Sequence, residues 1–131
     1  MPFKPWSGSS IAQRIEDILD AIEALNGHIA GMDVHAFMAD RKTMSAAERE
    51  LQIISEALSK LVQLEANLVA DGDRFEARFP DIEVYKIRGL GNMLRHEYGV
   101  ISQMRLWEII TGPSLPQLKA AIEKYGPPPG T

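Results

Sequence analysis

The segment IRGLGNMLRHEY, which runs from Ile87 to Tyr98, organises the rest of this chain. On a helix with about 3.6 residues per turn, its large apolar side chains share one face. These are Ile87, Leu90 and Leu94. Three polar side chains follow one another at intervals of four residues on a second face. These are Arg88, Asn92 and His96. The segment therefore predicts an amphipathic helix with one face for packing and one for chemistry.

The polar face carries the groups that cleavage of an RNA backbone requires. One group must remove the proton of the 2′-hydroxyl, another must stabilise the charge at phosphorus, and the leaving 5′-oxygen must be protonated. Histidine suits the proton transfers because its pKa is about 6.5, and arginine suits the phosphate because its planar guanidinium donates two parallel hydrogen bonds. We expect His96 to be the general acid and base, and Arg88 or Arg95 to bind phosphate. Alternatively, His96 only stabilises a helix C-terminus and the arginines are solvated.

Five segments of the chain carry a family resemblance. In the segment quoted above, Asn92, Leu94, His96 and Tyr98 fit the pattern N-x-L-x-H-x-Y. The other segments are FMADRKTMSAAERELQIISEALSKL (37–61), FPDI (79–82), and the pair WEII (107–110) and LPQLKAAI (115–122). By these motifs, over roughly residues 10–125, the chain resembles the HepT-like ribonuclease toxins of the HEPN superfamily.

The resemblance implies an all-α fold, an up-and-down bundle of four to five helices that forms a homodimer. It implies a metal-independent endoribonuclease toxin with no cofactor, with RNA as its substrate and a cognate minimal nucleotidyltransferase as its antitoxin. In the family the motif helices of two protomers line a shared cleft, so that Arg88 of one protomer could serve His96 of the other. The same resemblance makes Asn92 and Glu56 supporting residues, and Tyr98 the residue that the antitoxin modifies with a nucleotide.

One position departs from the family pattern. The family usually has arginine directly before the motif asparagine, where this chain has Gly91, and Arg88 lies eight residues before His96. Two other functions therefore stay open. One is a catalytically weakened HEPN subunit that binds a nucleotidyltransferase or a nucleotide without cleaving RNA, and the other is a nucleotide-binding module.

Three residues of the two central helical segments have two interpretations each. Gly89 and Gly91 each cost a helix about 1 kcal/mol relative to alanine, so a reason for them is expected. Either another backbone approaches closely there, as a dimer mate would, or the glycines leave room for a ligand. Glu56 is either an ordinary hydrated helix residue or a partner that orients Asn92 or an arginine.

Composition predicts one cytoplasmic domain. The 131 residues are 45% hydrophobic, enough for one core, so residues 1–131 are expected to form a single domain. Eighteen acidic and fourteen basic residues give a net charge of -4, which argues against a general nucleic-acid-binding surface. Cysteine is absent, no apolar run approaches the length of about 18 residues that suggests a membrane span, and the N-terminus lacks a signal-peptide core. His28 and His35 are interpreted as loop or surface residues, because neither cysteine nor a Glu-x-x-His pair accompanies them.

Apolar residues at three- and four-residue spacing predict the helices. In chain order the expected elements are a helix from Ile11 to the region 27–31, a short turn over 34–39, a long helix over 43–69, a connector over 70–79, the motif helix from Pro80 or Asp81 to Gly99, a short helix after Ser102, and a last helix from Ser114 to Tyr125. The expected N-caps are Ser9 or Ser10, Thr43 or Ser45, Ser102 and Ser114. Residues 1–9 are expected to form an extended N-terminal arm and residues 126–131 a disordered tail.

Overall fold

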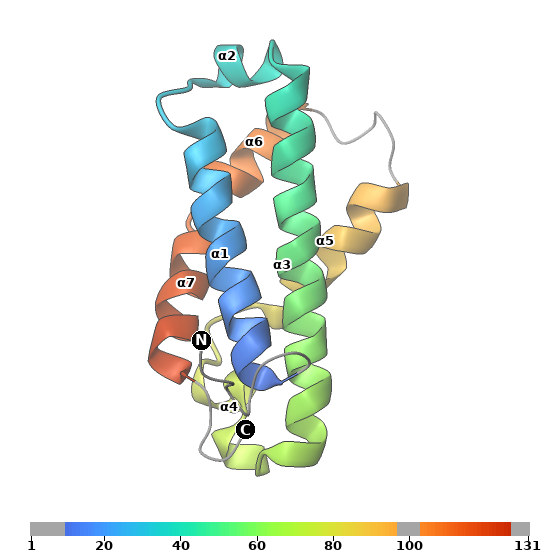
Figure 1. The fold of residues 1–131 in the computed structure, drawn as a ribbon, viewed down its shortest axis with the longest axis vertical. Helices are drawn as coiled ribbons and strands as arrows, with labels where there is room; N and C mark the ends of the chain where they lie inside the picture. Colours follow the sequence, from blue (N-terminus) through green and yellow to red (C-terminus); the bar gives the residue numbers. More distant parts are fainter. Residues whose placement is uncertain (1–9, 97–102, 127–131) are drawn as a thin grey trace, which may run out of the picture.

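The computed structural model describes residues 10–96 and 103–126, apart from the side chains of Arg95 and His96. Within these residues the chain forms seven α-helices and one 3-10 helix, and no strand. The five longer helices are α1 (Ile11–Ile29), α3 (Arg41–Leu68), α5 (Val84–His96), α6 (Gln103–Thr111) and α7 (Ser114–Tyr125). The chain runs up through α1, down through α3, up through α5, and down through α6 and α7 (Figure 1). The predicted all-α, up-and-down bundle is confirmed.

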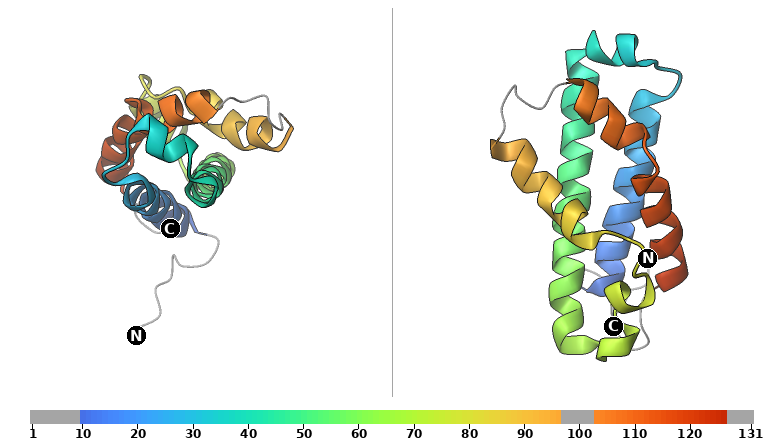
Figure 2. Two further views of the ribbon diagram at one scale, coloured as in Figure 1. Left: turned by 90° about the horizontal axis from the view of Figure 1, so that it is seen from above. Right: turned by 180° about the vertical axis from the view of Figure 1, so that it is seen from behind.

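The helices α1 and α3 lie side by side and form one side of the bundle (Figures 1 and 2). Each contributes an apolar stripe at three- and four-residue spacing, and burying one such side chain stabilises the fold by about 1.5–3 kcal/mol. The fully buried large residues of the two stripes are Ile11, Ile18, Ile22 and Leu25 from α1, and Leu51, Ile54, Leu58 and Leu61 from α3. The helix α7 packs beside α1 and completes this core with Leu118 and Ile122.

The starts of α1 and α3 confirm one predicted cap and correct another. Ser10 caps α1 by accepting a hydrogen bond from the Gln13 N–H at 3.2 Å. At α3 the cap is Asp40, whose carboxylate accepts from the Thr43 N–H at 3.0 Å and from the Thr43 hydroxyl at 2.8 Å. These hydrogen bonds hold the pKa of Asp40 below its usual value. The prediction of Thr43 or Ser45 was wrong, because Thr43 donates to a cap one turn earlier instead of being the cap.

The short helix α2 (Val34–Met38) confirms the predicted turn. Asp33 caps it by accepting a hydrogen bond from the Ala36 N–H at 2.8 Å. Phe37 is fully buried, and its ring centroid lies 5.1 Å from that of Trp107 in α6. This aromatic pair joins α6 to α2, the helix at the upper end of the bundle in Figure 1.

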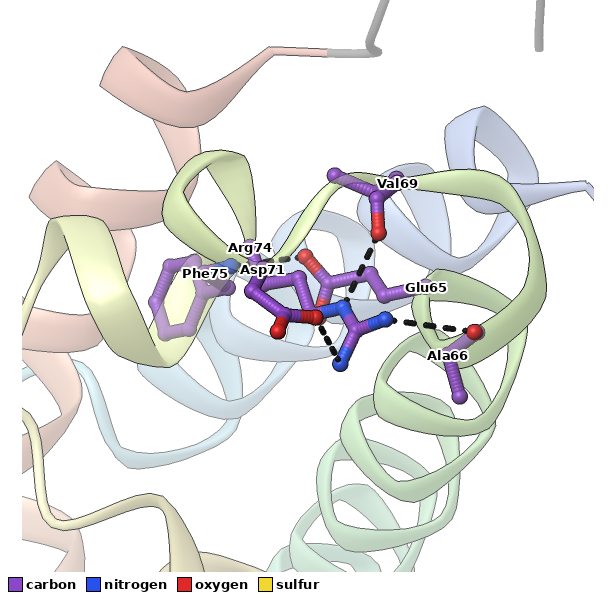
Figure 3. Close-up of polar contacts among 6 residues, drawn as sticks. All are labelled: Glu65, Ala66, Val69, Asp71, Arg74 and Phe75. Atoms are coloured by element: carbon purple, nitrogen blue, oxygen red, sulfur yellow. Dashed lines mark hydrogen bonds and ion pairs between the residues drawn. The ribbon is translucent and has the colours of Figure 1, made fainter.

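The predicted connector contains two short helices, the 3-10 helix η1 (Asp71–Asp73) and α4 (Phe75–Arg78). Their position depends on Glu65, which is 1% exposed although it is charged. A carboxylate oxygen of Glu65 accepts a hydrogen bond from the backbone N–H of Phe75 at 2.7 Å (Figure 3). The first N–H groups of a helix have no partner within the helix, so this carboxylate satisfies one of those of α4.

Arg74 binds the segment where α3 ends and η1 begins. Its Nε donates to the Val69 carbonyl at 3.0 Å, and one terminal nitrogen donates to the Ala66 carbonyl at 3.2 Å (Figure 3). The other terminal nitrogen lies 3.1 Å from a carboxylate oxygen of Asp71. Arg74 thus satisfies backbone carbonyls at the C-terminus of α3, where cations are favoured.

Glu65 also binds the end of α7. The hydroxyl of Tyr125 donates to the same carboxylate oxygen at 2.6 Å, and Tyr125 is 5% exposed. Its ring meets the Phe75 ring edge-on, with centroids 5.6 Å apart. Burial, and then the hydrogen bond to Glu65, raise the pKa of Tyr125 above its ordinary value. One buried carboxylate therefore joins α3, α4 and α7.

Two helix starts differ from the prediction. The motif helix α5 begins at Val84 and not at Pro80 or Asp81, because turn bonds from the Ile82 N–H to the Phe79 carbonyl and from the Val84 N–H to the Ile82 carbonyl come first. Ser114 does not cap α7. It is the first helical residue, and the cap position is Pro113, which makes no side-chain hydrogen bond.

The remaining expectations, about the two chain ends and the segment after α5, lie largely outside the described residues. These are the arm over residues 1–9, the helix end at Gly99, the cap at Ser102 and tail residues 127–131. Gly126, the first residue of the expected tail, is described and ends α7 with a φ of 58°. None of the described helices combines the length and the apolar composition that a membrane span needs.

Replacement of Tyr125 by phenylalanine should lower the free energy of unfolding by about 1.5–3 kcal/mol, the range for a hydrogen bond to a charged group. A raised tyrosine pKa stabilises the folded state below the unfolded value of about 10, and this contribution is lost as the pH rises from there toward the folded value. Urea unfolding should therefore show that the difference in the free energy of unfolding between wild type and Tyr125→Phe becomes smaller from neutral pH to about pH 10.5. The control is Tyr85→Phe, since Tyr85 is 71% exposed. A difference that is constant with pH would contradict this role for Tyr125.

Candidate functional site

The motif helix α5 divides its faces broadly as the sequence predicted. Val84 and Ile87 are buried, and Leu90 and Leu94 pack partly buried against the core. On the other side Arg88 is half-buried and Asn92 is exposed. The helix crosses α3 obliquely, and its C-terminal end stands away from the bundle (Figures 1 and 2).

A serine of α3 contacts the backbone of α5. Ser55 is 3% exposed, and its hydroxyl donates to the Arg88 carbonyl at 2.7 Å. The same oxygen accepts a hydrogen bond from the Gly91 N–H at 3.2 Å. Both hydrogen-bonding capacities of the hydroxyl are therefore used on one turn of the motif helix, between Arg88 and Gly91.

Gly91 makes this contact possible. A Cβ at position 91 would lie 3.0 Å from Ser55 Oγ and 3.4 Å from Ser55 Cβ, so either the serine or the helix would have to shift. A Cβ at Gly89 would meet nothing within 4 Å. The sequence suggested the close approach of another backbone or room for a ligand, whereas at Gly91 the neighbour is a side chain of the same chain. An arginine at position 91 would begin on this buried face.

A second serine, one turn further along α3, binds the side chain of Arg88. The Arg88 Nε donates to Ser59 Oγ at 3.2 Å. Within the described part of the chain, the two terminal nitrogens of Arg88 have no hydrogen-bond partner. The guanidinium is thus held at one nitrogen while its other donors stay available for a ligand such as a phosphate.

Lys86, two residues before Arg88, is paired with the residue that directly precedes α5. The Nζ of Lys86 lies 2.8 Å from a carboxylate oxygen of Glu83, one turn earlier. This hydrogen bond raises the pKa of Lys86 and lowers that of Glu83. Arg88 is therefore the better candidate for a phosphate ligand among the described cations of α5.

A groove of about 570 Å³ lies on the side of α5 that faces α6 and the start of α7. Its apolar lining includes Ile87, Leu90 and Met93 from α5, Ile109 from α6 and Leu115 from α7. Lys86, Arg105 and Glu108 line it as well. The motif helix thus has α3 on one side and an open, largely apolar groove on the other.

The other predicted site residues are placed as follows. Glu56 is exposed on α3, directly after Ser55, and Asn92 is exposed on α5 one turn after Arg88. Arg95 and His96 are the last two residues of α5, with side chains outside the described part. Tyr98 also lies outside the described residues.

The sequence prediction missed Ser55 and Ser59. The sequence contained a signal for them, since they are two hydroxyl residues four positions apart in the longest predicted amphipathic helix. Ser55 also stands directly after Ile54, which belongs to the apolar stripe. A buried serine in an apolar stripe needs a hydrogen-bond partner, and a helical glycine elsewhere marks where a partner can come close.

The histidines outside the motif lie elsewhere in the fold. His28 is in the last turn of α1, and its Nε2 lies 3.2 Å from a carboxylate oxygen of Glu50. His35 is exposed on α2. Within residues 10–94 and 103–126, no group of three or more potential metal ligands comes together.

Comparisons with known proteins agree with the family resemblance. The family model described as "Ribonuclease HepT-like" matches residues 18–125. A protein named "Probable ribonuclease HepT" from Thermococcus cleftensis is 32% identical over 110 residues, which cover 84% of this chain and 90% of that protein. A protein named "Putative RNase MJ1380" from Methanocaldococcus jannaschii is 27% identical over 107 residues, which cover 82% and 88%. No solved structure gave a significant match.

The two glycines of α5 provide a matched pair of substitutions. Gly89→Ala should raise the free energy of unfolding by about 0.5–1 kcal/mol, because alanine favours a helix and the site is open. Gly91→Ala should be less stable than Gly89→Ala by about 1 kcal/mol or more, because its Cβ crowds Ser55. In a Ser55→Ala background this difference should shrink. Equal gains at the two positions in thermal or urea unfolding would argue against the contact.

Proposed function

Because the chain belongs to the ribonuclease HepT-like family, we propose that it is a metal-independent endoribonuclease and the toxin of a toxin–antitoxin pair. One observation supports the proposal best. Arg88 lies on the motif helix with its Nε held by Ser59, and its terminal nitrogens have no partner among the described residues. A guanidinium in this state suits a phosphate oxygen pair.

The chemistry assigns one role to each motif residue. His96 removes the 2′-hydroxyl proton, and the 2′-oxygen attacks phosphorus while the bond to the 5′-oxygen breaks. An imidazole then returns a proton to that leaving oxygen. Arg88 stabilises the extra negative charge at phosphorus, with Arg95 as the other candidate for this role. Asn92, one turn from each of Arg88 and His96 and exposed, is proposed to orient the RNA, and Glu56 to support that alignment.

A single chain places the two catalytic groups far apart. His96 lies eight positions after Arg88 on the helix, about 12 Å along the axis at 1.5 Å per residue. We therefore propose a homodimer in which Arg88 of one protomer serves His96 of the other. The open groove beside α5 and the oblique exit of its C-terminal end leave that helix accessible to a second copy. A dimer would also double the positive charge near the RNA in a chain whose net charge is -4.

The proposed partner is a minimal nucleotidyltransferase, which acts as the antitoxin by modifying Tyr98. Tyr98 follows Arg95 and His96 within three residues. A nucleotide monophosphate on Tyr98 would therefore bring a negative phosphate to the residues that are proposed to bind the RNA phosphate. A cytoplasmic location is part of the same proposal, because the proposed RNA substrate and the proposed partner would both be found there.

A second function has one specific observation in its favour. Gly91, at the place of the family's usual arginine, packs against Ser55. A chain that had lost this arginine could persist as a subunit that binds the nucleotidyltransferase without cleaving RNA. Under this alternative, the wild-type dimer would cleave no RNA.

His96→Ala should abolish RNA cleavage, by at least about a hundredfold, because general acid–base catalysis contributes about 10²–10⁴-fold. The melting temperature should stay unchanged, because the sequence places His96 off the apolar face of α5. The matched control is His35→Ala, which alters an exposed histidine on α2 and should retain full activity. A loss of helicity together with activity would make His96 structural, and an inactive wild type would favour the binding subunit.

Incubation with the partner nucleotidyltransferase, ATP and magnesium should add one adenylate mass to the peptide that contains Tyr98, and cleavage should stop. Tyr98→Phe should prevent both effects. Tyr85→Phe is the control, because Tyr85 is 71% exposed on α5 and lies outside the motif. Mass spectrometry that finds the adduct only on Tyr85, or inhibition that persists in Tyr98→Phe, would leave steric occlusion by the partner as the mechanism.

A further inference from the structure

We propose that Ser59 is a positioning residue that directs the guanidinium of Arg88 toward the RNA phosphate, with Ser55 fixing the main chain of the same arginine. This inference rests on the proposed ribonuclease function. It concerns residues of α3 that lie outside the motif and that the sequence prediction did not single out. The contact in question joins Ser59 and Arg88, 29 residues apart in the chain.

One serine binds the main chain of Arg88 and the other binds its side chain. The Ser55 hydroxyl donates to the Arg88 carbonyl at 2.7 Å, and Ser59 Oγ accepts from the Arg88 Nε at 3.2 Å. Since Ser55 and Ser59 are four residues apart, they lie on one face of α3. A long arginine side chain has many rotamers in water, and fixing its main chain and its Nε leaves few of them.

Engagement of Nε also decides how a ligand can approach. A guanidinium presents two edges for paired hydrogen bonds, one that includes Nε and one formed by the two terminal nitrogens. In this chain the Nε donor is used by Ser59, so the remaining pair is the terminal one. Two oxygens of a phosphate, approached end-on, match that pair.

The same arrangement accounts for the place of the arginine in this chain. A Cβ at position 91 would crowd Ser55 at 3.0 Å, whereas the side chain of Arg88 starts one turn earlier and reaches Ser59. Ser55 and Gly91 thus set the helix spacing, and Ser59 sets the direction of the cation.

The test is a double-mutant cycle that measures binding of a short 2′-O-methyl RNA of mixed sequence. This probe cannot be cleaved, because its 2′-oxygen is blocked, so failure of the proposed cleavage activity would not affect the measurement. Arg88→Ala should weaken binding about tenfold or more, and Ser59→Ala by about two- to tenfold, the range for one hydrogen bond. Because Ser59 acts through Arg88, the double variant should bind no worse than Arg88→Ala alone.

Two further variants separate positioning from a structural role. Ser59→Thr keeps the hydroxyl and should restore wild-type binding, and Ser45→Ala, an exposed serine on the same helix, should change nothing. If Ser59→Ala lowers the melting temperature, the same binding measurement is made with Ser59→Cys, because cysteine has the shape of serine and leaves no cavity but accepts hydrogen bonds poorly. The proposal is overturned if the Ser59 variant binds like wild type, or if its effect is equally large with and without Arg88.

Discussion

The hydroxyl of Ser55 lies between the two helices that matter most for the site, α3 and α5. It donates to the Arg88 carbonyl and accepts from the Gly91 N–H, so it ties one turn of the motif helix to the longest helix of the fold. The helix α5 packs chiefly on α3, and its other side borders the open groove. The orientation of the motif residues relative to α3 therefore depends on this contact, and the absence of a side chain at position 91 lets Ser55 make it without crowding.

The helix α3 contacts its neighbours through polar side chains in two regions. Toward its middle, Ser55 and Ser59 bind α5, and near its C-terminus Glu65 binds α4 and α7 through Phe75 and Tyr125. A buried polar group that is fully satisfied specifies a unique arrangement, because any alternative packing would leave it without partners. The same helix thus secures the core and presents the motif helix at the surface.

The apolar periodicity of the sequence predicted each of the long helices, since burial of a stripe depends mainly on local spacing. What it could not predict were the polar contacts between distant segments. The bonds of Ser55 and Tyr125 join residues 33 and 60 positions apart, and neither local propensity nor spacing contains that information. The wrong cap of α3 has a local cause, because Asp40 lies only three residues before Thr43 and accepts its N–H. For the site, the sequence placed Arg88 and Asn92 on the polar face, but the serines that hold the arginine came only with the packing of α3 on α5.

The claim that two protomers share one site can be tested by subunit mixing. A dimer purified with one Arg88→Ala chain and one His96→Ala chain, each with its own affinity tag, contains an intact pair only if Arg88 and His96 come from different protomers. A two-fold symmetric dimer has two such sites, so the mixed dimer should recover about half of the wild-type cleavage rate, while each parent dimer stays inactive. A mixed dimer as inactive as its parents, or a chain that is monomeric at micromolar concentration, would contradict the shared site.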